Sequence, residues 1–228
     1  MVLAEITELW KAEKKDYVKP ASYSAYTLLL EKHIIPVFGN QERIAEDDIQ
    51  RYILQKLKEG LSKNSIQHAI TVLKMVMYYG ASHMLCERPE WNVRYPAETR
   101  RNGPEIMNIR NQRKLMKYLC EHQTTHNFGI LLCLYTGLRI GELCALQWKD
   151  LDMQNGIVKV RKTLQRLYVK DGNAGKSTIM IGDPKTRTSW RDIPMPNDLI
   201  IIMRKYGKNH SPDNYIINDK PYPLEPRT

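Results

Sequence analysis

Apolar residues in the first 85 positions recur at intervals of three or four, which places them on one face of an α-helix. The pattern predicts a helix around residues 3–10, a second that starts after Pro20, and a third over residues 47–60. Pro36 and Gly39 are expected to end the second helix, because proline interrupts helical hydrogen bonding and glycine favours helix ends. The first part of the chain is therefore predicted to be helical.

A fourth helix is predicted to open at Ser62, with one apolar and one polar side. The apolar side comprises Ile66, Ile70, Leu73, Met77 and Tyr78. The polar side comprises Lys63, Asn64, Gln67, Thr71 and Lys74. Solvent exposure explains such a side on most surface helices. The alternative is DNA contact, in which lysines neutralise phosphates, amides reach base edges, and Tyr23 and Tyr26 of the second helix join them.

Helical spacing breaks between residues 87 and 104, where three prolines and Gly103 interrupt the pattern. We interpret this stretch as a linker between a domain of residues 1–86 and a domain of residues 105–228. The stretch carries Arg94, Arg100 and Arg101. These arginines are phosphate contacts if the linker crosses the flank of a duplex, and otherwise they belong to an ordinary connector.

The rest of the chain mixes helical and strand patterns, so the predicted fold class is α+β and mainly α. Helices are expected over residues 111–121 and 126–135, from Ile140, and over 199–206. Strands are expected at residues 158–160, 179–181 and 190–194. The first two are separated by the turn-rich stretch 170–175 and are interpreted as a hairpin with a loose tip.

Positive charge is concentrated in the second part of the chain. The net charge is +10; residues 1–100 carry 14 Lys and Arg against 13 Asp and Glu, whereas residues 101–228 carry 21 against 12. Such an excess attracts polyanions, and nucleic acid is the leading candidate. Solvated lysine-rich faces give the same composition, so charge alone leaves both explanations open.

The longest mainly apolar run, residues 128–135, is far shorter than the roughly 20 residues that cross a bilayer, and no leader pattern opens the chain. A protein that is neither secreted nor membrane-spanning is expected. Its four cysteines form no C-x-x-C pair, which fits reduced thiols in a cytoplasm.

The most specific stretch runs from residue 136 to 152 and reads TGLRIGELCALQWKDLD. It closely resembles the first sequence box of the tyrosine recombinase (phage integrase) family. Residues 184–194, PKTRTSWRDIP, resemble the family's β-hairpin element, in which a lysine precedes S-x-R-x-I-P. The helical half, with HIIPVFG at residues 33–39, is similar to the family's core-type DNA-binding domain. The likeness is greatest to integrases of bacterial phages and conjugative transposons.

The resemblance implies a fold and an activity. The fold is a helical core-type (SAM-like) DNA-binding domain followed by an incomplete mixed α/β catalytic domain. The activity is DNA integration and recombination through a phosphotyrosine intermediate, without a cofactor or metal. The expected partner is double-stranded DNA at attachment sites in the bacterial cytoplasm, on the nucleoid, with self-association on that DNA.

Two residues match the family's catalytic set. Arg139 would clamp the scissile phosphate, because a metal-free enzyme needs fixed donors such as a planar guanidinium. Lys185 would donate a proton to the departing 5′ oxygen. Glu142, one turn after Arg139, is assigned support, and Arg187 is assigned to DNA contact. The alternatives are that Arg139 only caps a helix or pairs with Glu142, and that Lys185 is a turn lysine facing solvent. Arg191 and Trp190 are expected to brace their strand.

Other parts of the family pattern are missing from these residues. None of the six histidines is followed by arginine three positions later, so the H-x-x-R box is absent. Tyr206, Tyr215 and Tyr222 come too early to be the nucleophile of the family. The pattern indicates a truncated chain, whose self-association would be weakened.

These observations leave three hypotheses about the function of the protein. The first, which we favour, is a recombinase fragment that binds DNA but cannot cleave it. The second is an enzyme completed by another polypeptide that carries the missing box. The third is a DNA-binding regulator or competitor of recombination without chemistry.

Overall fold

The computed structural model describes residues 1–97, 103, 105–122, 124–171, 174–184, 189–206 and 209–225. It divides into two compact units. Met1–Arg101 and Leu167–Thr178 form the first, here called the helical unit, and Asn102–Arg166 and Ile179–Thr228 form the second, here called the mixed unit.

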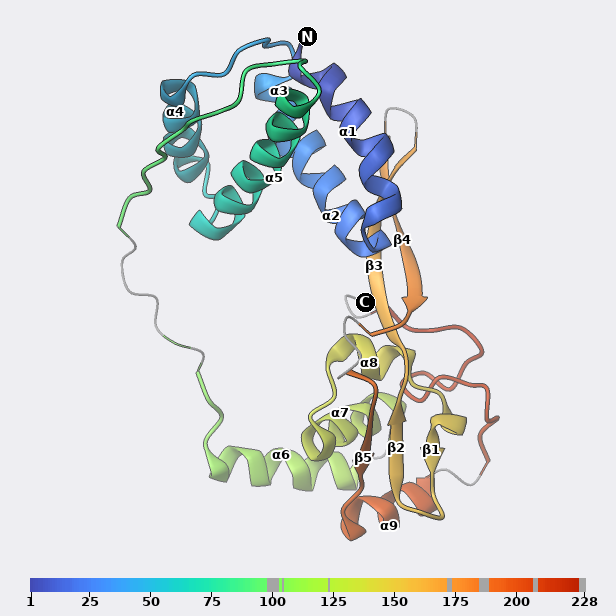
Figure 1. Cartoon of the computed structure of the whole chain (residues 1–228). Coiled ribbons are helices and arrows are strands. Elements are labelled where there is room, and N and C mark those ends of the chain that lie inside the picture. The colour runs from blue at the N-terminus through green and yellow to red at the C-terminus, as the bar shows by residue number, and fades with distance from the viewer. Residues whose placement is uncertain are drawn as a thin grey trace. The chain divides into compact units, whose positions relative to one another are not determined.

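The helical unit contains the four predicted helices and two short additional turns (Figure 1). Its elements are α1 (Leu3–Tyr17), α2 (Pro20–Leu29), the π-helical turn η1 (Leu30–Ile34), α3 (Ile35–Phe38), α4 (Glu46–Lys58) and α5 (Lys63–Ser82). The predicted start of α5 is confirmed, since the Ser62 hydroxyl accepts a hydrogen bond from the Ser65 amide at 3.1 Å and so caps the helix. Gly60, at φ +89°, adopts the left-handed conformation that ends α4.

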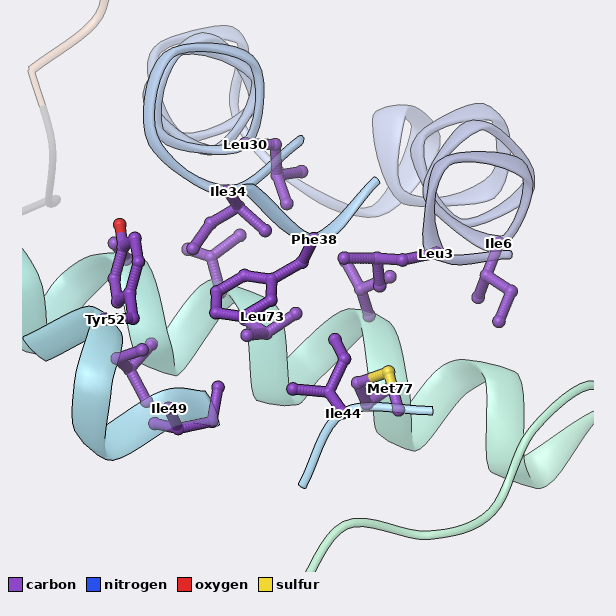
Figure 2. Packing of buried hydrophobic residues seen from close by; sticks show 14 of the residues in the cluster. Leu3, Ile6, Leu30, Ile34, Phe38, Ile44, Ile49, Tyr52, Leu73 and Met77 are labelled. Carbon is purple, nitrogen blue, oxygen red and sulfur yellow. The ribbon is translucent and has the colours of Figure 1, made fainter. Parts of the chain in front are cut away.

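The core of this unit is filled from all of its helices, and Figure 2 shows Phe38 lying among the side chains of Ile34, Tyr52 and Leu73. The Tyr52 hydroxyl donates to the His33 carbonyl at 3.1 Å, which satisfies its buried polar end. The expectation that Tyr78 belongs to the apolar side of α5 was wrong, because its side chain is 43% exposed with the Arg88 guanidinium over its ring. Val76 fills the core at that turn in its place, beside Met77, which is buried as predicted.

The described part of the predicted linker, residues 87–97, is extended and lies against the helices (Figure 1). Trp91, Val93 and Tyr95 pack on the core of the helical unit, and the Trp91 indole donates to the Ile44 carbonyl at 3.0 Å. We call residues 87–97 the strap.

The mixed unit combines helices with a three-stranded antiparallel sheet of order β1-β2-β5. Val158 pairs with Leu151 on one side and Ile193 on the other, and it is fully buried. The elements are α6 (Ile109–Glu121), α7 (Thr125–Thr136), α8 (Ile140–Ala145), the 3-10 turn η2 (Trp148–Asp150), β1 (Leu151–Asp152), β2 (Ile157–Val160), β5 (Arg191–Pro194) and α9 (Asn197–Tyr206). The α+β, mainly helical fold class is confirmed.

A separate two-stranded hairpin consists of β3 (Thr163–Asp171) and β4 (Ala174–Gly182). The predicted pairing of strands 158–160 and 179–181 was therefore wrong, because β2 pairs with β1 and β5. Apolar residues do not alternate along these strands: Leu164 and Leu167 of β3 are three positions apart, and β4 carries its apolar residues consecutively at 179–181, so the period that identifies a half-buried strand is weak there. In the part of the chain that is described, no helix is long and apolar enough to cross a membrane.

Candidate phosphate site and nucleic-acid interface

Arg139 stands at the junction of two helices of the mixed unit. Gly137, at φ +65°, ends α7 in the left-handed conformation, and the buried Leu138 anchors the short connection. Arg139 then precedes the first residue of α8, with its side chain 72% exposed. The chain thus presents a guanidinium to solvent from a fixed backbone position.

A buried carboxylate holds this guanidinium. Glu142 is 3% exposed; its Oε1 accepts from Arg139 Nη1 at 3.0 Å, and its Oε2 accepts from the Arg139 backbone amide at 3.0 Å. Arg191 of β5 completes the cluster, since its Nη1 and Nη2 donate to the two Glu142 oxygens at 2.9 and 2.8 Å. These hydrogen bonds, from Arg191 first and then from Arg139, hold the pKa of Glu142 at about 2 against the opposing effect of burial.

One carboxylate therefore orients two arginines. Arg139 uses one of its five N–H donors on the Glu142 side chain, which leaves the exposed edge of the guanidinium open to a planar or tetrahedral anion. Two parallel N–H groups of an arginine guanidinium can each donate a hydrogen bond to an oxygen of the same phosphate. Sequence reasoning assigned Arg191 only to its strand; its place in the S-x-R-x-I-P run was visible, but the β2–β5 pairing that brings it to Glu142 was not.

Gly141 leaves room for the neighbouring strand at this junction. A Cβ there would lie 2.7 Å from the Leu164 carbonyl oxygen and 2.8 Å from the Thr163 hydroxyl. We expect Gly141→Ala to lower the free energy of unfolding of the mixed unit by about 1–3 kcal/mol, as overpacking does. Gly129→Ala on α7 is the matched control, because its Cβ would meet side chains only at 3.4 Å or more. Chemical denaturation measures both, and equal stability of the two variants would contradict this account.

Four predicted site residues lie outside the described residues: Lys185, Arg187, Arg100 and Arg101. In sequence, Lys185 and Arg187 fall between the end of β4 at Gly182 and the start of β5 at Arg191. They do not belong to the turn of the β3–β4 hairpin.

The strap covers part of the predicted polar side of α5. Asn64 and Thr71 are exposed, whereas Gln67 is half-buried. Lys63 Nζ donates to the Pro96 carbonyl at 3.3 Å, and Lys74 Nζ donates to the Trp91 carbonyl at 3.5 Å. The strap therefore lies along this side of the helix.

The two tyrosines of α2 have different surroundings. Tyr26 packs on the core, with its ring centroid 5.9 Å from that of Trp10. Tyr23 lines a cavity of about 360 Å³ together with Leu167–Lys170 of β3, within the helical unit. Both tyrosines are half-buried, and of the two Tyr23 is the one that lines this cavity.

The three tyrosines excluded as nucleophiles also differ in environment. Tyr206 stacks on Phe128 at 4.9 Å, and burial raises the pKa of its hydroxyl. Tyr215 is 9% exposed, and its backbone pairs with Gln147 and Lys220. Tyr222 is 56% exposed, with the Lys220 ammonium over its ring. Within the described ranges, no group of three or more His, Cys, Asp and Glu side chains could hold a metal ion.

Comparison with known proteins covers both units. Residues 106–228 match the phage integrase family, and residues 2–58 match the phage integrase N-terminal SAM-like domain. The ICEBs1 integrase of Bacillus subtilis (strain 168) is 25% identical over 219 residues, which cover 90% of this chain and 57% of that protein. The putative defective protein IntQ of Escherichia coli (strain K12) is 26% identical, covering 79% of this chain and 49% of that protein. The chain spans about half the length of the curated relatives it matches.

Solved structures share the fold. The Tn1549 transposon integrase in complex with transposon right end DNA superposes with a TM-score of 0.68 at 21% identity, covering 98% of this chain and 73% of that one. A lambda integrase tetramer bound to a Holliday junction gives a TM-score of 0.64 at 14% identity, covering 100% of this chain and 62% of that one.

Proposed function

Because the chain belongs to the phage integrase family, we propose that it binds duplex DNA through the helical unit and holds a DNA phosphate at Arg139 in the mixed unit. The observation that carries this proposal is the cluster of Arg139, Glu142 and Arg191. A carboxylate that is 3% exposed orients a guanidinium that is 72% exposed, and this arrangement suits an arginine that receives an anion from solvent.

We further propose that, in the reaction of the family, Arg139 clamps the phosphate under attack and Lys185 protonates the departing oxygen. The helical unit and the excess of Lys and Arg in residues 101–228 support DNA as the partner. The DNA-bound Tn1549 and lambda integrases support attachment-site DNA and self-association on it as the finer proposal. We propose that the protein acts in the bacterial cytoplasm, on the nucleoid, where such DNA lies.

Removal of the Arg139 guanidinium is the direct test of the proposed phosphate contact. We expect Arg139→Ala to weaken binding to a 30-base-pair duplex about tenfold, because charge-assisted hydrogen bonds contribute roughly 1.5–3 kcal/mol. Arg204→Ala is the control, since it removes an equal charge from an exposed position on α9. Fluorescence anisotropy measures both. If both variants lost the same affinity for the duplex, the phosphate contact could not be assigned to Arg139. If the wild-type chain did not bind the duplex, the proposed DNA-binding function would be wrong.

A second candidate, a DNA-binding competitor without chemistry, is favoured by the packing of Tyr206 and Tyr215. A nicked suicide duplex separates it from an active enzyme, because a phosphotyrosine intermediate is trapped on such DNA. We expect these 228 residues to form no covalent adduct on a denaturing gel. If a second polypeptide carrying the H-x-x-R box and a tyrosine restored cleavage, and Arg139→Ala abolished it, the trans-completed enzyme would be supported instead.

A further inference from the structure

A cavity of about 360 Å³ lies within the helical unit, between α1, α2 and residues 167–170 of β3. This volume falls in the range of small-molecule sites in proteins, about 300–1,000 Å³. The lining residues are Lys11 and Lys15 of α1, Pro20, Tyr23, Ser24 and Thr27 of α2, and Leu167, Tyr168, Val169 and Lys170 of β3. Apolar side chains and lysines therefore share the lining, and none of these described lining residues is acidic.

Hydrogen bonds order the β3 wall of the cavity. The Tyr168 amide donates to the Ser24 hydroxyl at 2.5 Å, and the Tyr168 hydroxyl donates to Glu31 Oε2 at 3.0 Å. The Lys170 ammonium pairs with Glu31 Oε1 at 3.4 Å. The apolar side chain of Leu167, beside these contacts, is 8% exposed. A ligand that enters a cavity with an ordered wall causes little further loss of conformational entropy.

The α1 wall contains a buried cation, Lys11. Its side chain is 8% exposed, and its Nζ donates to Glu8 Oε1 and to Glu31 Oε1, each at 3.1 Å. Burial opposes the charge, but these hydrogen bonds raise the pKa of Lys11 above its ordinary value, so the ammonium group stays charged. An ammonium group has three donors, and two hydrogen bonds leave one for an acceptor in the cavity.

The charge around the cavity favours an anion. Lys15 and Lys170 add two lysines to Lys11, and these three oppose the two acidic partners, Glu8 and Glu31, which leaves an excess of one positive charge. A matching molecule therefore has an anionic head. Its other end must be apolar, to match the rest of the lining. That apolar part comprises Pro20, Leu167, Val169 and the ring of Tyr23.

We propose that this cavity binds a small carboxylate with an apolar body and that Lys11 receives the carboxylate group. Such a ligand would contact α1, α2 and β3 together. It would stabilise their packing, because it binds only where the three elements meet. Binding of this ligand does not require DNA.

Hexanoate, 1-hexanol and hexylammonium, titrated separately into the intact chain, test the class of ligand. The three probes share an alkyl chain and differ in the charge of the head group. Hexanoate should bind at least about tenfold more tightly than 1-hexanol, because a hydrogen bond to a charged group is stronger than a neutral one. Hexylammonium should bind more weakly than 1-hexanol. Two-dimensional NMR of the backbone amides measures the three dissociation constants.

Two outcomes of this titration would overturn the proposal. If 1-hexanol or hexylammonium bound as tightly as hexanoate, the cavity would not select an anion. If hexanoate at millimolar concentration shifted no amide signals of the lining residues, the cavity would not be a site for this class of ligand.

Val169→Glu places a carboxylate in the lining and should weaken hexanoate binding at least about tenfold, because like charges repel. Val169→Gln adds the same length without the charge and should keep most of the affinity, which guards against a folding defect. Leu54→Glu on α4 is the matched control: Leu54 is 45% exposed against 44% for Val169, and it is not among the lining residues. Equal affinities of the two glutamate variants would overturn the assignment to this cavity.

Lys11→Met tests the role of the buried ammonium group, because it keeps an unbranched side chain and removes the charge. Its affinity for hexanoate should fall to its affinity for 1-hexanol, whereas Lys14→Met, at a position of α1 that is not among the lining residues, should keep the preference. A Lys11→Met variant that still prefers hexanoate tenfold would show that Lys11 does not receive the carboxylate group.

Discussion

Replacing Glu142 with glutamine should lower the free energy of unfolding of the mixed unit by about 3–5 kcal/mol, the loss typical of breaking a buried ion pair from one side. The variant keeps the shape of the side chain, but its amide group offers donors to Arg191 where a carboxylate accepted two hydrogen bonds. Arg191 and Arg139 would then repel each other across a neutral group.

An exposed pair of the same unit provides the control. Lys149 and Asp213 lie 2.7 Å apart with side chains 46% and 74% exposed, so Asp213→Asn should leave the free energy of unfolding almost unchanged. Urea denaturation followed by tryptophan fluorescence measures both variants. A cost for Glu142→Gln as small as that for Asp213→Asn would show that the cluster does not stabilise the unit.

The difference in free energy of unfolding between wild type and Glu142→Gln should also depend on pH. The pKa of Glu142 is lowered to about 2 in the folded chain, against about 4.3 for an unperturbed glutamate. The stabilisation is therefore complete above the unfolded value and is lost as pH falls through the folded value. We expect the stability difference between wild type and Glu142→Gln to be constant from pH 7 to about 5.5 and to shrink progressively toward pH 2.5. A difference that stays constant down to pH 2.5 would argue against a depressed pKa.

Duplex DNA affinity should fall by about a hundredfold or more between 50 and 200 mM salt. The slope expected is near −3.6 in log K against log salt if four residues contact phosphates as predicted, namely Lys63, Lys74, Arg94 and Arg139. The cause is the release of counterions from the duplex as these groups replace them. Double replacement of Lys63 and Lys74 by alanine should reduce the magnitude of that slope by about 1.8.

A salt titration by fluorescence anisotropy gives both slopes. Lys117→Ala on α6 serves as the control, because that side chain is 78% exposed and pairs with Glu121 of its own helix. Binding that is insensitive to salt over this range would contradict a backbone-dominated interface.

The sequence was most informative where the interactions are local. The start of α5 follows from Ser62 and Gly60, and the proximity of Arg139 to Glu142 follows from their separation by one helical turn. Arg191 lies 49 positions from Glu142, and only strand pairing brings them together. The docked strap had a signal of its own in the alternation of Trp91, Val93 and Tyr95, but its prolines and arginines are equally typical of a linker.

The docked strap also changes where the helical unit ends. Trp91, Val93 and Tyr95 pack on the core of that unit, so a fragment that stopped at residue 86 would leave the apolar surface beneath them open to water. The shortest fragment expected to keep the packing of the helical unit therefore extends past Tyr95.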